Sequence, residues 1–158
     1  MTVSISVGFD DGVGPASRGL VQGGMRTIGK LVRDAVRATF AAEGVRDGTV
    51  SVTLVGDEAI AELNRQYLSR EGPTDVIAFP LYEQGEAPIG DVYIDLDQAA
   101  RQAEAEGIPA SEEIVRLAVH GALHVLGHVH PEGAGRTRSN MWKIQERIIA
   151  QLMAAGTG

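Results

Sequence analysis

Residues 111–130 read SEEIVRLAVHGALHVLGHVH, and this stretch decides how the C-terminal half of the chain is interpreted. Ser111 followed by Glu112 and Glu113 is typical of a helix N-terminus, because a hydroxyl caps the first amides and acidic side chains favour the positive end of the helix dipole. We expect this helix to run to Leu126. Gly127 follows, and a glycine there lets the chain leave the helix in a left-handed turn and fold back.

All four histidines of the protein lie in this stretch, and three of them have the spacing of a metal site. His120 and His124 are four residues apart, so their rings project from one face of a helix, and the turn at Gly127 would bring His130 to meet them. Three neutral imidazoles form a tetrahedral zinc site whose fourth position is left for water, which suggests a catalytic ion. The sequence therefore predicts one Zn²⁺ per chain, held by His120, His124 and His130; another divalent transition metal, such as nickel, has similar preferences.

Two other interpretations of the histidines are weighed against this one. In the first, His128 would be a ligand because it lies four residues after His124, but Gly127 interrupts the helix, so we expect His128 to be exposed or supporting and not a ligand. In the second, the histidines are core or surface residues that cluster by chance. The spacing H-x3-H-x2-G-x2-H also occurs in metzincin proteases, which need a glutamate after the first histidine as general base. Gly121 holds that position here and cannot transfer a proton, which argues against peptide hydrolysis.

Hydrophobic periodicity outside this stretch predicts elements in the order β-α-β-α-β-β-α-α-α. Residues 10–24 contain Gly, Pro and Ser and are expected to form a loop, and Asp57 is the expected N-cap of the second helix. Strands grouped early and helices late indicate an α+β fold in which helices pack on one small, mostly four-stranded sheet, with the zinc-binding helix near the C-terminus. The strands are expected at residues 2–9, 50–54, 76–79 and 90–96, and the helices at residues 25–42, 57–67, 97–107, 111–126 and 140–154.

Length, composition and charge exclude several classes of protein. A chain of 158 residues predicts one domain over residues 1–158. It has no cysteine, which excludes a disulfide scaffold and a cysteine nucleophile, and its net charge of −7 argues against a wholly basic nucleic-acid binder. The N-terminus lacks the basic start of a signal peptide, and no apolar run approaches the ~20 residues of a membrane helix. We therefore expect a cytoplasmic protein with no membrane partner.

The histidine stretch resembles the signature H-G-x-L-H-L-x-G-x-D-H of the bacterial YbeY endoribonuclease family, with HGALHVLGHVH at residues 120–130 in register. The resemblance covers roughly residues 50–150. Its other parts are Leu63-Asn64, Tyr67, PTDVIAFP at residues 73–80, GDVYI at residues 90–94, and a helix with Met141 and Glu146 that is similar to the family's M-x-x-x-E-x-x-I-L ending, the Glu being offset by one.

The resemblance implies a zinc-dependent, single-strand-specific endoribonuclease, a hydrolase of RNA phosphodiesters that takes part in rRNA maturation and ribosome quality control. Its partner would be single-stranded RNA, in particular ribosomal RNA or the small ribosomal subunit. Thr74 and Asp75 precede a strand that the family places near the metal, and they are candidate substrate-binding residues. Neither a catalytic general base nor an oligomeric state follows from the sequence.

Three positions depart from the family pattern: Leu68 replaces an arginine, Ala78 a serine and Val129 an aspartate. The missing arginine would grip a phosphate by a bidentate charged contact, and Arg70 is the candidate to replace it. These departures keep an alternative open, namely a ribosome-associated RNA-binding factor with a retained metal site and little nuclease activity. A metallohydrolase on another substrate is a weaker alternative because of Gly121.

Overall fold

A computed structural model describes residues 2–128 and 140–155, and it has the α+β architecture that the sequence predicts. Four strands form one mixed sheet in the order β1-β2-β4-β3. Strands β1, β2 and β4 run parallel, and β3 runs antiparallel to β4 at the edge. The strands are β1 (Val3–Phe9), β2 (Gly48–Val55), β3 (Val76–Pro80) and β4 (Ile89–Asp95).

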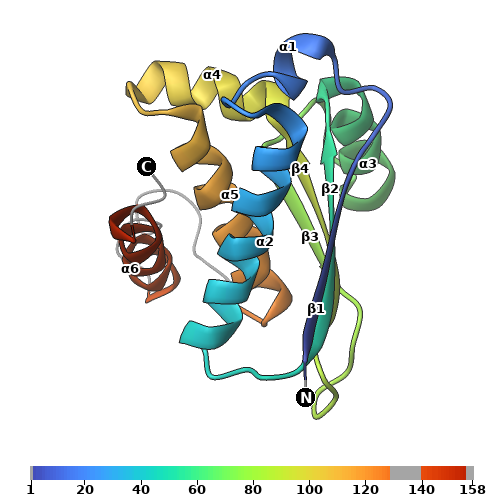
Figure 1. Ribbon diagram of the computed structural model, residues 1–158. Helices are drawn as coiled ribbons and strands as arrows, with labels where there is room; N and C mark the ends of the chain where they lie inside the picture. The colour runs from blue at the N-terminus through green and yellow to red at the C-terminus, as the bar shows by residue number, and fades with distance from the viewer. Residues whose placement is uncertain (1, 129–139, 156–158) are drawn as a thin grey trace.

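Helices cover both faces of this sheet, as Figure 1 shows, with α2 and α5 on one face and α3 on the other. Helix α6 packs against α5 and α2, on the side away from the strands. The described part of the chain has no helix long and apolar enough to cross a membrane. The helices are α1 (Pro15–Arg18), α2 (Gly24–Ala42), α3 (Asp57–Leu68), α4 (Leu96–Glu106), α5 (Ala110–Val125) and α6 (Asn140–Ala154).

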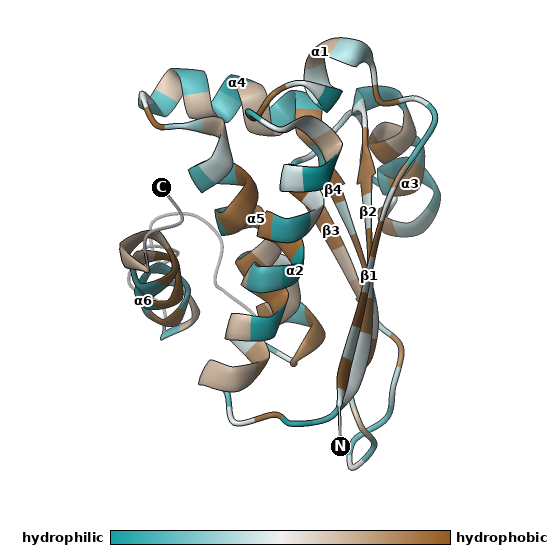
Figure 2. Ribbon diagram, in the orientation of Figure 1, coloured by the Kyte–Doolittle hydropathy of each residue, from teal (hydrophilic) through white to brown (hydrophobic). Residues whose placement is uncertain are grey.

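The main core lies between the sheet and the layer of α2 and α5, where Figure 2 shows hydrophobic strands against a largely hydrophobic α5. Alternation along the strands directs Val50, Val52 and Leu54 of β2 into this core, and all three are buried. On the other face, Ile60 of α3 packs with Ile77 in a smaller apolar cluster. The period-2 pattern of the strand sequence therefore determines which face of the sheet packs against α2 and α5.

Two glycines let α5 lie very close to β4. A Cβ atom at residue 121 would stand 2.6 Å from Cγ1 of Val92, and one at residue 90 would stand 2.6 Å from Cγ2 of Val125. Real Cβ atoms essentially never make contacts this short. Gly121 holds the position where a metzincin has its glutamate base. The close packing of α5 on β4 requires a glycine at this position.

Three details of the sequence prediction are wrong. Residues 10–24 contain the short helix α1, which begins at Pro15, a residue whose fixed φ suits the first helical position. The residue preceding α3 is Gly56, so Asp57 is its first residue and not its N-cap. Helix α5 begins at Ala110 after Pro109, which places Ser111 inside the first turn.

Candidate metal centre and its cavity

His120 and His124 lie on one face of the last two turns of α5, where their imidazoles converge. The Nε2 atoms of the two rings are 3.1 Å apart, and the ring centroids are 4.7 Å apart at an interplanar angle of 67°. Two nitrogens that each lie about 2.0–2.1 Å from one tetrahedral ion are separated by roughly 3.3–3.4 Å. The observed pair therefore fits two ligands of a single zinc ion with little adjustment.

The turn after α5 follows the sequence prediction as far as the structure describes it. Gly127 has a φ of 97°, the left-handed conformation that ends the helix, and the amide of His128 donates to the carbonyl of Leu123 at 3.0 Å. Nε2 of the His128 ring lies within hydrogen-bonding distance of Oε1 of Glu43, at the end of α2. His130, the third predicted ligand, and Val129 lie outside the described residues, so the complete ligand set stays a prediction.

A cavity of about 590 Å³ opens beside His120, between α5, α6 and the end of α4. Its lining carries far more negative than positive charge, since Arg116 is the one arginine or lysine among the lining residues in the described part of the chain. An acidic wall favours cations and disfavours an isolated phosphate. The lining residues are Asp75, Gln102, Glu106, Ile108, Glu112, Glu113, Arg116, Leu117, His120, Met141, Trp142, Gln145 and Glu146.

Arg116 holds three of these carboxylates in place and joins α5 to α6. Its guanidinium makes two contacts with Glu146, at 2.9 and 3.0 Å, and single contacts with Glu112 at 3.3 Å and Glu113 at 3.4 Å. Burial raises the pKa of Glu146, but the hydrogen bonds from Arg116 and Gln145 outweigh it and hold that pKa below its usual value. For Glu113, burial dominates and raises the pKa.

Gln145 of α6 was missed by sequence reasoning, which singled out its neighbour Glu146. Oε1 of Gln145 lies 2.7 Å from Nδ1 of His120, and the side chain is buried. The family-like pattern M-x-x-x-E, counted from Met141, ends on residue 145, so the register of that pattern was the available signal.

Comparison with known proteins identifies the family to which the sequence belongs. The family model described as endoribonuclease YbeY matches residues 21–153. This chain belongs to the YbeY endoribonuclease family. It is 43% identical over 127 residues to a protein of Carboxydothermus hydrogenoformans named endoribonuclease YbeY, covering 80% of this chain and 87% of that one. It is 40% identical over 123 residues to the Thermus thermophilus protein of the same name, covering 75% and 87% of the two chains.

A solved structure supports the fold. The solution structure of a Thermotoga maritima protein superposes with a TM-score of 0.60 at 24% sequence identity, covering 96% of this chain and 90% of that one. Because 96% of this chain is covered, the likeness extends over the sheet and the helices together.

The three predicted substrate-binding residues have different positions relative to the cavity beside His120. Asp75, the residue before β3, lines it, whereas Arg70 and Thr74 are absent from the lining in the described part of the chain. All three belong to the connection between α3 and β3. Buried Asn64 anchors that connection by donating from Nδ2 to the carbonyl of Gly72 at 2.9 Å. Arg70 is exposed, and so is Leu68, the departure from the family arginine.

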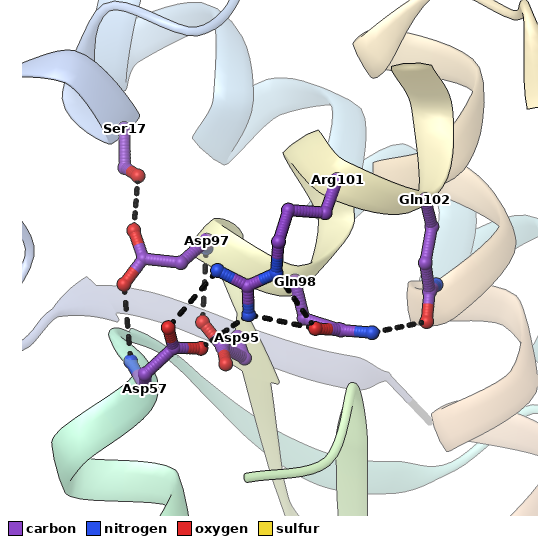
Figure 3. A network of polar contacts seen from close by, with 7 residues as sticks. All are labelled: Ser17, Asp57, Asp95, Asp97, Gln98, Arg101 and Gln102. Atoms are coloured by element: carbon purple, nitrogen blue, oxygen red, sulfur yellow. Dashed lines mark hydrogen bonds and ion pairs between the residues drawn. The ribbon is translucent and has the colours of Figure 1, made fainter. Parts of the chain in front are cut away.

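A second group of carboxylates lies where β4 ends and α3 and α4 begin (Figure 3). Oxygen atoms of Asp57, Asp95 and Asp97 all lie within 4.8 Å of one another, a spacing at which carboxylates can hold a divalent cation. Arg101 already neutralises part of this charge through contacts of 2.7 and 3.0 Å with Asp57. Asp97 accepts hydrogen bonds from the Ser17 hydroxyl at 2.5 Å and from the Asp57 amide at 3.1 Å.

Asp95 is the buried member of this group. Its Oδ1 accepts from the amide of Asp97 at 2.9 Å and caps α4, while its Oδ2 has no hydrogen-bond partner in the described structure. Burial, followed by the proximity and negative charge of the Asp57 carboxylate, raises the pKa of Asp95 to about 8. Sequence reasoning missed the group because Asp57 is far from the D-L-D run at residues 95–97.

Proposed function

We propose that this protein is a zinc-dependent, single-strand-specific endoribonuclease that acts in rRNA maturation and ribosome quality control. The observation that carries the proposal is the pair of imidazole Nε2 atoms 3.1 Å apart beside a cavity, in a chain of the YbeY family. His120, His124 and His130 would hold one Zn²⁺ per chain, or another divalent transition metal. The substrate would be single-stranded RNA, in particular ribosomal RNA or the small ribosomal subunit, met in the cytoplasm.

The chemistry follows from the ligand type. Held by His120, His124 and His130, a zinc ion would supply Lewis-acid chemistry toward a phosphoryl oxygen and would lower the pKa of a water molecule to about 7. The carboxylates of the cavity favour a cation, and Arg116 holds those of Glu112, Glu113 and Glu146 in place. Without a cation the same carboxylates repel a phosphodiester, so productive RNA binding in this cavity should require the metal.

The test is single-turnover cleavage of a short single-stranded RNA by protein of known metal content. We expect cleavage by the wild type, and loss of both zinc and cleavage in His124→Ala and in a chelated sample. His128→Ala is the matched control, because its ring contacts Glu43 instead of converging with the other two, and it should keep both. Unchanged metal content and cleavage in His124→Ala would refute the proposal.

One observation favours the alternative of an RNA-binding factor with a retained metal site and little nuclease activity. Arg116 is the one arginine or lysine that the described residues contribute to the lining, and three carboxylates engage it, while Leu68 stands where the family has an arginine. This alternative predicts stoichiometric zinc, salt-sensitive binding to RNA or ribosomal subunits, and no cleavage above the His124→Ala background. Arg70, Thr74 and Asp75 remain the proposed substrate contacts under both functions.

A further inference from the structure

Resting on the proposed metal site, we infer that Gln145 is a positioning residue that fixes the tautomer of His120 so that its Nε2 presents a lone pair to the cation. The inference begins with the contact of 2.7 Å between Nδ1 of His120 and Oε1 of Gln145. A carbonyl oxygen accepts and cannot donate, so this contact requires a proton on Nδ1. A neutral imidazole with its proton on Nδ1 has its lone pair on Nε2, the atom that faces His124.

The orientation of the Gln145 amide is itself determined by a neighbour. Nε2 of Gln145 donates to the Glu146 carboxylate at 3.1 Å. An ionised carboxylate accepts only, and hydrogen bonds hold the pKa of Glu146 below its usual value. If the amide were flipped, its oxygen would face the carboxylate and its NH₂ group would face Nδ1. Glu146 therefore keeps Oε1 directed at His120.

Arg116 completes the chain of contacts. It holds Glu146 through two contacts of 2.9 and 3.0 Å, a bidentate ion pair between α5 and α6. Arg116 thus fixes the Glu146 carboxylate, which in turn orients the Gln145 amide. Gln145 is buried, with 7% of its surface exposed, so water does not compete freely for the Nδ1 contact. Partners that orient a ligand histidine in this way typically change metal affinity by about 10–100-fold when they are removed.

The experiment measures Zn²⁺ affinity by competition with a chromophoric chelator, with no reference to RNA cleavage. Gln145→Leu removes the acceptor and should weaken zinc binding about 10–100-fold, whereas Gln145→Glu keeps an acceptor and should bind within about threefold of wild type. Gln151→Leu is the matched control, since it makes the same change at an exposed position of α6 and should bind as the wild type does.

A second measurement avoids the risk that Gln145→Leu fails to fold. Nitrogen chemical shifts of the His120 ring in metal-free wild-type protein, at a pH where the ring is neutral, should report the Nδ1–H tautomer. The Nε2–H tautomer, or zinc binding by a folded Gln145→Leu variant within about threefold of wild type, would overturn the inference. If the wild type bound no zinc, or His124→Ala bound zinc equally well, the proposed metal site itself would be wrong. Failure of the metal site is therefore distinguishable from failure of the role assigned to Gln145.

Discussion

Gly121 of α5 lies against Val92 of β4 so closely that a Cβ at residue 121 would stand 2.6 Å from Cγ1 of the valine. The first prediction follows from this contact. Gly121→Ala should destabilise the protein by about 1–3 kcal/mol, because the added methyl group forces α5 away from the sheet and outweighs the better helix propensity of alanine. The free energy of unfolding in urea measures this effect.

Gly29 of α2 is the control for that substitution. It is also buried within a helix, but a Cβ there would meet nothing closer than Nη1 of Arg33, at 3.5 Å, which is an ordinary contact. Gly29→Ala should therefore stabilise the protein by up to about 1 kcal/mol. Changes of the same sign at both glycines would contradict the explanation by packing.

The second prediction concerns Asp95, whose pKa is raised to about 8, first by burial and then by Asp57. The folded state holds a proton on this carboxyl that the unfolded state releases near the ordinary value of 3.8, so the contribution of Asp95 to stability should fall as the pH rises from 4 to 8. Asp95→Asn keeps an acceptor for the Asp97 amide and carries no charge at any pH in this range. The variant should match wild type near pH 4 and exceed its stability by about 1–3 kcal/mol near pH 8.

Thermal or urea unfolding over that pH range tests this prediction. A stability difference between Asp95→Asn and wild type that stays constant with pH would show that Asp95 does not take up a proton on folding.

The third prediction concerns Arg116, which pairs with carboxylates on α5 and α6. Arg116→Met keeps the apolar stem of the side chain but leaves Glu146 without its cation, which should cost about 1–3 kcal/mol at pH 7. The pKa of Glu146 is lowered in the folded state, so its pairing stabilises the protein above the ordinary value near 4.5 and the stabilisation is lost below it.

The destabilisation of Arg116→Met should therefore diminish when unfolding is measured at pH 3. Lys30→Met is the control, since Lys30 pairs with Asp34 on an exposed surface and its loss should change stability by less than about 0.5 kcal/mol. An equal effect of both substitutions would mean that Arg116 acts as an ordinary surface charge.

The fourth prediction tests the departure at Leu68, which is 42% exposed at the end of α3. Leu68→Arg should tighten binding of a short single-stranded RNA and steepen the dependence of log Kd on log salt by about 0.7 for one added phosphate contact. Leu68→Gln, polar but uncharged, should leave the slope unchanged, and Arg70→Gln should reduce it if Arg70 serves as the phosphate contact. Equal slopes in all variants would place the RNA path away from this connection.

The sequence predicted most of the elements because their periodicity reflects burial. Val50, Val52 and Leu54 alternate and lie in the core, and the helical pattern of α2 likewise buries Ile28 and Val32. Helix α1 was missed because so short a helix has no periodicity to detect. Tertiary contacts hold it, including the hydrogen bond from Ser17 to Asp97 and the one from Nε of Arg18 to the carbonyl of Val13 at 2.7 Å.

The candidate site was predictable where its residues share one helix. The spacing of His120 and His124 predicts a shared face, and the structure brings their Nε2 atoms together. Gln145 and the carboxylate group of Asp57, Asp95 and Asp97 were not predicted because their contacts join separate elements. No local sequence pattern shows which side chains of different elements meet. Arg70 and Thr74 have no contact with the cavity in the described residues, so their role depends on the resemblance alone.

The position of α6 has a consequence for the dynamics of the site. Helix α5 packs against α2, α4, α6 and the sheet, whereas α6 contacts mainly α5 and α2 within the described structure. Amide hydrogens of α5 should therefore exchange with solvent only when the whole molecule unfolds, while those of α6 exchange through smaller, more frequent openings. Each such opening would withdraw Gln145 from His120, so the rate at which the site captures and releases its ion would be set by the last helix.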